Sequence, residues 1–101
     1  PQGHVLVDGA TEQAVPSIIA NIRALGFSER DVKLIVGSHE HIDHMGGFAA
    51  LKAATGAAVR VSVAARPVIE SGRSAADDPQ AGLLPPMTPV PVETVVADGE
   101  V

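Results

Sequence analysis

The chain has 101 residues, of which 46% are apolar and 19% charged, and its formal net charge is −5. This length predicts one domain or part of one, and the composition excludes a disordered or collagen-like chain. Seven basic residues stand against twelve acidic ones and form no basic cluster, so nucleic acid is not an expected partner. The chain has no cysteine, which excludes a disulfide scaffold and a thiolate metal site within these residues.

The two ends of the sequence are typical of a piece cut from a longer chain. The first residue is Pro1, and a strand-like segment begins at His4. We therefore expect residues 1–101 to form a single partial domain that is truncated at both ends. No apolar run approaches the roughly 18 residues of a membrane span, so no membrane partner is expected.

The first third of the chain predicts a strand, a helix and a second strand. The β-branched segment His4–Val7 ends at an Asp-Gly turn and predicts a strand. Apolar residues at the spacing i, i+3, i+4 and i+7 predict a helix over about 14–25. Ser28 and Asp31 form a candidate capping box before Val32–Val36, an apolar run that predicts a strand covered on both faces. This succession indicates an α/β fold with the two strands parallel.

The remaining elements are weaker predictions. A second helix is expected over about 47–55. Apolar and polar residues alternate over Val59–Val63, which predicts a strand with one solvent-exposed face. A third helix is expected over about 64–71. The Pro-rich segment 72–91 shows no period and predicts a long loop, and valines within 92–96 predict a last strand.

Three of the four histidines lie within six residues, directly after the buried strand. In an extended segment alternate side chains point the same way, so His39 and His41 can converge on one ion. In the same extended segment Asp43 would point to the same side as His39 and His41. A turn before Gly46-Gly47 would instead direct Asp43 and His44 together toward a second ion. Zinc suits both sets of donors, and the end of a strand in an open sheet is where ligands bind.

Other interpretations of this segment remain open. The histidines could be solvated in a polar loop or cap the next helix, and copper, iron or manganese could use similar ligands. Glu40 should point away from the site by strand parity. Asp8 could orient the metal loop through hydrogen bonds or could simply form an Asp-Gly turn. Gly46 and Gly47 are expected to allow close approach of the backbone.

The pattern His39-x-His41-x-Asp43-His44 followed by two glycines resembles the signature of the metallo-β-lactamase superfamily. A His directly after the Asp is most similar to subclass B3, because subclass B1 enzymes carry a small or basic residue there. The resemblance implies an α/β fold, half of an αββα sandwich with a mixed β-sheet flanked by helices. It extends over nearly the whole chain, including the stretches 5–9, 20–27, 51–57 and 77–80.

The resemblance also implies a set of metal ligands. His39 and His41 would hold the first of two zinc ions, and Asp43 and His44 the second, with one further His for each ion outside this chain. His4 would not supply either, because it lies at the far end of its strand, and we expect it at the surface. The implied activity of the full-length parent is hydrolysis of the β-lactam amide bond by a metal-bound hydroxide that Asp43 orients.

The family resemblance further implies a small-molecule β-lactam substrate, a monomeric parent enzyme and a periplasmic or secreted location. The 101 residues alone should be inactive. Two alternatives remain: another hydrolase of this fold, such as a glyoxalase II-like thioesterase or a lactonase, and a non-catalytic metal-binding module. The family often has an aromatic residue near Ala81, which is absent here, and Asp77 and Asp78 are expected in a solvated loop.

Overall fold

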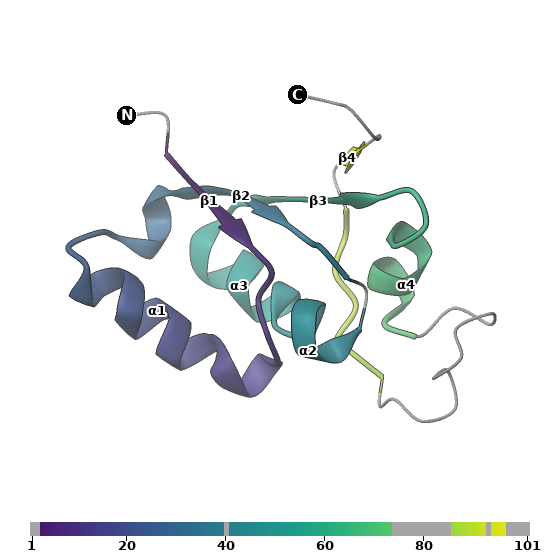
Figure 1. Ribbon diagram of the computed structural model, residues 1–101, viewed down its shortest axis with the longest axis horizontal. Coiled ribbons are helices and arrows are strands. Elements are labelled where there is room, and N and C mark those ends of the chain that lie inside the picture. Colours follow the sequence, from purple (N-terminus) through teal and green to yellow (C-terminus); the bar gives the residue numbers. More distant parts are fainter. Residues whose placement is uncertain (1–2, 40, 74–85, 93, 97–101) are drawn as a thin grey trace.

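Four parallel strands form one sheet in the order β1-β2-β3-β4 (Figure 1). The structure is a computed structural model that describes residues 3–39, 41–73, 86–92 and 94–96. The family resemblance implied a mixed sheet, whereas the described strands pair only in parallel because helices or long connections join them. The strands are β1 (His4–Val7), β2 (Val32–Val36), β3 (Ala58–Ser62) and β4 (Thr94–Val96).

The predicted helices are confirmed, and one short helix was not predicted. In the described ranges the α-helices are α1 (Val15–Ala24), α2 (Ile42–Met45), α3 (Phe48–Thr55) and α4 (Arg66–Ser71). The unpredicted helix is α2, which begins inside the histidine-rich segment. Two 3₁₀ turns, Glu12–Ala14 and Glu29–Asp31, precede α1 and β2.

Local sequence signals explain several of these boundaries. Ser28 caps the second 3₁₀ turn by accepting a hydrogen bond from the Arg30 amide at 3.1 Å, and Asp31 accepts one from the Ser28 amide at 3.2 Å. The capping box is therefore confirmed. Helix α4 ends at Gly72, whose φ of +77° is a conformation that favours glycine.

The helices cover one face of the sheet, below the strands in Figure 1. Ile35 and Val59 on this face are fully buried and belong to the same hydrophobic core as Phe48 of α3. On the opposite face Val5 and Val7 are 60% and 65% exposed. The described helices lie on one side of β2 only, so the predicted cover of this strand on its second face stays a prediction.

Residues 86–92 return to the covered face of the sheet. The Met87 amide donates to the Gly72 carbonyl at 2.7 Å, and Val90 and Val92 are buried in the core. Residues 86–92 form no regular element, as the predicted loop requires, and the last strand begins at Thr94. Within the ranges that the structure describes, no helix combines the length and apolar character needed to cross a membrane. The predictions for Glu40, Asp77, Asp78 and Ala81 lie outside those ranges.

Candidate metal centre

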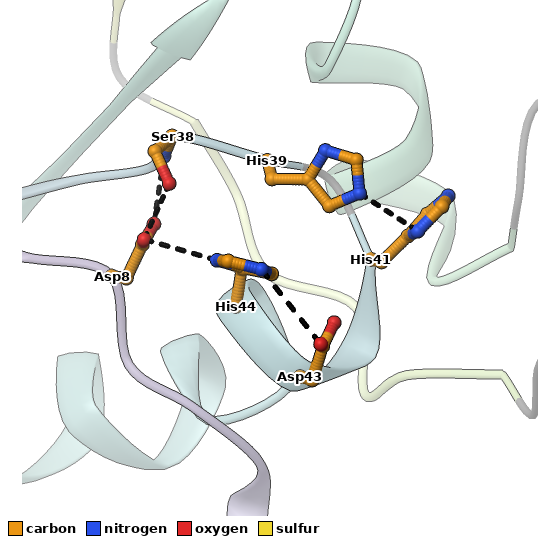
Figure 2. Close-up of polar contacts among 6 residues, drawn as sticks. All are labelled: Asp8, Ser38, His39, His41, Asp43 and His44. Atoms are coloured by element: carbon orange, nitrogen blue, oxygen red, sulfur yellow. Dashed lines mark hydrogen bonds and ion pairs between the residues drawn. The ribbon is translucent and has the colours of Figure 1, made fainter.

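The candidate site lies at the carboxyl edge of the sheet, where β1 and β2 end (Figure 2). Asp8 follows β1, the segment from Ser38 to His41 follows β2, and Asp43 and His44 lie on α2. Parallel strands bring their carboxyl ends to one edge, so Asp8 meets Ser38 and His44, which lie 30 and 36 positions later in the chain. His4 instead is exposed at the start of β1 and packs edge-to-face on Phe27, as expected for a surface residue.

His39 and His41, which we call the first donor pair, lie side by side. His39 Nε2 and His41 Nδ1 are 2.8 Å apart, and the ring centroids are separated by 4.1 Å. The His44 ring lies 5.0 Å from that of His39. The predicted convergence of the first two histidines is therefore seen in the structure, while their role as zinc ligands stays a prediction.

Asp43 and His44 form the second donor pair, on the first turn of α2. The extended parity predicted for Asp43 is wrong, because the chain turns into a helix at Ile42. The amides of His44 and Met45 both donate to the His41 carbonyl at 3.0 Å and close this turn. As a result His44 Nε2 faces Asp43 Oδ2 at 3.7 Å. Asp43 and His44 therefore lie close together as expected, and it is a helical turn that brings them together.

Asp8 links the ends of the two strands to the second donor pair. Its Oδ1 accepts from the Ser38 amide at 2.7 Å, and its Oδ2 contacts both the Ser38 hydroxyl and His44 Nδ1, the latter at 3.1 Å. Burial alone would raise the pKa of Asp8, but the hydrogen bonds from Ser38 and His44 hold that pKa below its ordinary value. The carboxylate therefore does more than close an Asp-Gly turn. Ser38 was not among the predicted site residues, although a hydroxyl residue directly before the first His of the motif was a visible signal.

The backbone around the two glycines is packed as closely as expected. A Cβ on Gly47 would lie 2.5 Å from the Gly9 carbonyl oxygen and 2.9 Å from a Val15 methyl group. The φ of Gly47 is −87°, so the position needs glycine for close approach and not for a left-handed backbone. The Gly9 amide also donates to the His44 carbonyl at 2.7 Å, which holds α2 against the end of β1.

The donor atoms fit two partial zinc sites. Two ligands of one tetrahedral zinc, each about 2.0 to 2.1 Å from the ion, lie roughly 3.3 Å apart. The first donor pair at 2.8 Å and the second at 3.7 Å are each within roughly 0.5 Å of that separation. Within the described part of the chain, no three His, Cys, Asp or Glu residues are arranged to hold a metal ion. A zinc ion at either donor pair would therefore need at least one further protein ligand.

Three solved structures with the same fold are metallo-β-lactamases of high similarity to this chain. MIM-1 from Novosphingobium pentaromativorans is 49% identical with a TM-score of 0.95, covering 98% of this chain and 36% of its own. MEM-A1, a subclass B3 enzyme from a soil metagenome library, is 51% identical with a TM-score of 0.93, and the match covers 99% of this chain and 38% of MEM-A1. SMB-1 bound to 2-mercaptoethanesulfonate is 46% identical with a TM-score of 0.92, and the match covers 99% of this chain and 39% of SMB-1.

The chain thus spans less than two fifths of the length of these enzymes. A family model described as the metallo-beta-lactamase superfamily matches residues 1–100. This match covers the strands, the helices and both donor pairs, and the similar structures include subclass B3 enzymes. The chain therefore belongs to the metallo-β-lactamase superfamily, with subclass B3 enzymes among its structural relatives.

Proposed function

We propose that residues 1–101 supply one half of the active site of a zinc-dependent enzyme that hydrolyses the amide bond of β-lactams. The observation that carries this proposal is the meeting of the two donor pairs at the carboxyl edge of the sheet. The chain that carries them is 46 to 51% identical to three metallo-β-lactamases. That similarity favours β-lactams over thioesters and lactones as the substrate class.

Each donor pair offers nitrogen or oxygen atoms suited to zinc. His39 Nε2 and His41 Nδ1 would hold the first ion. Asp43 and the Nε2 of His44 would hold the second, because Asp8 already occupies the Nδ1 of His44. A carboxylate on the outer nitrogen of a ligating imidazole is a common arrangement that fixes the ring and raises its basicity. Asp8 would play that part here.

Hydrolysis of a β-lactam adds one water across the amide bond. Zinc bound at these donors would supply a Lewis acid and lower the pKa of a water molecule to about 7. The Asp43 side chain is 70% exposed in this chain and can accept a hydrogen bond from the attacking water, which orients it toward the lactam carbonyl. The oxygen of that water bonds to the carbonyl carbon, the C–N bond of the lactam ring breaks, and a proton goes to the ring nitrogen. No Ser or Cys nucleophile is required.

The test uses the full natural chain that contains residues 1–101. Turnover of nitrocefin should be lost on dialysis against a chelator and restored by zinc. Inhibition by 2-mercaptoethanesulfonate is also expected, because a thiolate is a good zinc ligand and SMB-1 binds this compound. A thioester and a lactone serve as comparison substrates.

Three results would contradict the proposal in different ways. Turnover of the thioester or lactone without nitrocefin would indicate another hydrolase of the fold. Zinc binding without turnover of any of these substrates would indicate a metal-binding module. Tight binding of two zinc ions with nitrocefin turnover by the isolated 101 residues would show that the donor pairs need no further ligands, whereas we expect no measurable turnover.

A further inference from the structure

Ser38 makes two hydrogen bonds to one carboxylate, and the candidate metal ligands do not account for them. Its amide donates to Asp8 Oδ1 at 2.7 Å and its hydroxyl contacts Asp8 Oδ2. Both oxygens of Asp8 are therefore engaged by one residue from the end of β2. This arrangement fixes the plane of the carboxylate relative to the sheet edge (Figure 2).

The orientation of this carboxylate determines the tautomer of His44. An ionised carboxylate has only acceptor sites, so the contact between Asp8 Oδ2 and His44 Nδ1 requires a proton on Nδ1. In a neutral imidazole Nε2 then has a free lone pair. This is the nitrogen that faces Asp43 at 3.7 Å. The direction of one carboxylate thus decides which ring nitrogen can ligate a metal.

The backbone of Asp8 is in a conformation that needs support from surrounding contacts. Asp8 has a φ of +61°, a left-handed conformation that Asp tolerates better than most residues but that still has an energetic cost. Such conformations persist where surrounding contacts hold them. The contacts from Ser38 on the side chain and from the Asp8 amide to the Val36 carbonyl at 2.8 Å hold this one.

We propose that Ser38 is a positioning residue that orients Asp8, so that His44 keeps its proton on Nδ1 and presents Nε2 to a metal. The inference rests on the proposed function, because it gives this hydrogen-bond chain a purpose in zinc binding. Ser38 itself would contact neither the substrate nor the metal. It acts through Asp8 and His44.

The experiment compares Ser38→Ala, Ser38→Thr and a matched control, Ser28→Ala, in the full natural chain that contains these residues. Ser28 also bonds a nearby backbone amide, but it lies in the turn before β2. The first readout is the pair of ring-nitrogen shifts of His44 in metal-free, 15N-histidine-labelled protein. The second is the dissociation constant for Co²⁺ from its visible absorption. If Ser38→Ala does not fold, Ser38→Cys replaces it, because a thiol is a weak donor of similar size.

We expect Ser38→Ala to lose the distinct Nδ1–H pattern of His44 and to bind cobalt about 10-fold more weakly. Ser38→Thr should restore both readouts, since it keeps the hydroxyl. Ser28→Ala should lower the melting temperature without changing either readout. A Ser38→Ala protein that is less stable but keeps the tautomer and the cobalt affinity would overturn the proposal. The tautomer is measured without metal or substrate, so a failure of β-lactam turnover leaves this result interpretable.

Discussion

The two donor pairs are built by different means. The contact between His39 and His41 joins residues two positions apart, within one loop. His44 and Ser38 are instead tied to Asp8, 36 and 30 positions earlier in the chain. The first pair joins neighbouring residues, whereas the orientation of His44 in the second pair also depends on how the ends of β1 and β2 pack together. Changes at the end of β1 should affect the second pair more than the first.

The largest effect is expected from Asp43→Asn in the full natural chain. The change keeps the size of the side chain but removes a charged donor of the second pair and the acceptor that orients water. Nitrocefin turnover should fall by about 100-fold or more while the melting temperature stays near that of the wild type. Near-normal turnover would remove Asp43 from the mechanism.

Asp8→Asn should have a smaller effect that separates the two pairs. Asn also tolerates the left-handed backbone of Asp8, so the fold should be retained. The lost charge should weaken zinc binding at the second pair by about 10-fold to 100-fold and leave the first pair unchanged. Zinc titration by calorimetry resolves the two sites. Equal weakening of both would show that Asp8 supports the whole loop and not the second pair.

Gly47→Val tests the packing of α2 against the end of β1. A side chain at this position would collide with the Gly9 carbonyl, 2.5 Å from the new Cβ. We expect a loss of about 1 to 3 kcal/mol in the free energy of unfolding, measured by urea denaturation. Ala53→Val on the exposed surface of α3 controls for the lower helix propensity of valine. Equal losses in the two variants would show that the close approach is unimportant.

The smallest effect is expected away from both pairs, at Arg23 and Glu29. The hydrogen bond from Arg23 lowers the pKa of Glu29 from 4.5 to about 2. A lowered pKa favours the folded state above pH 4.5, and this contribution is lost as the pH falls through about 2. Arg23→Gln should return the Glu29 pKa toward 4.5, as read from its side-chain NMR signal. An unchanged pKa would show that the ion pair does not form in solution.

The elements that depend on neighbours along the chain could be predicted. The spacing of apolar residues in α1 (Val15–Ala24), the capping box at Ser28 and the stop at Gly72 each depend on a few consecutive residues. The α/β class followed from the order of these elements. The histidine-rich segment was also visible as a candidate site, because its spacing needs no knowledge of the fold.

The errors concern features that depend on contacts between distant segments. Strand parity placed Asp43 beside His41, but α2 starts at Ile42 and is held by the bond from the Gly9 amide to the His44 carbonyl. The described helices lie on one side of β2 only, so the cover on both faces that its apolar run predicted stays a prediction. Composition reports which residues can be buried, and it does not report which side another element covers.

The sequence alone determined the class of the fold and the types of donor atom, since both follow from local periodicity and side-chain chemistry. The tertiary structure decided which nitrogen of His44 faces Asp43, because that choice depends on Asp8 at the end of another strand. It also revealed Ser38 as the residue that engages both oxygens of Asp8. A hydrogen bond across 30 or 36 residues leaves no periodic signal in the sequence, so only the paired strands bring these groups together.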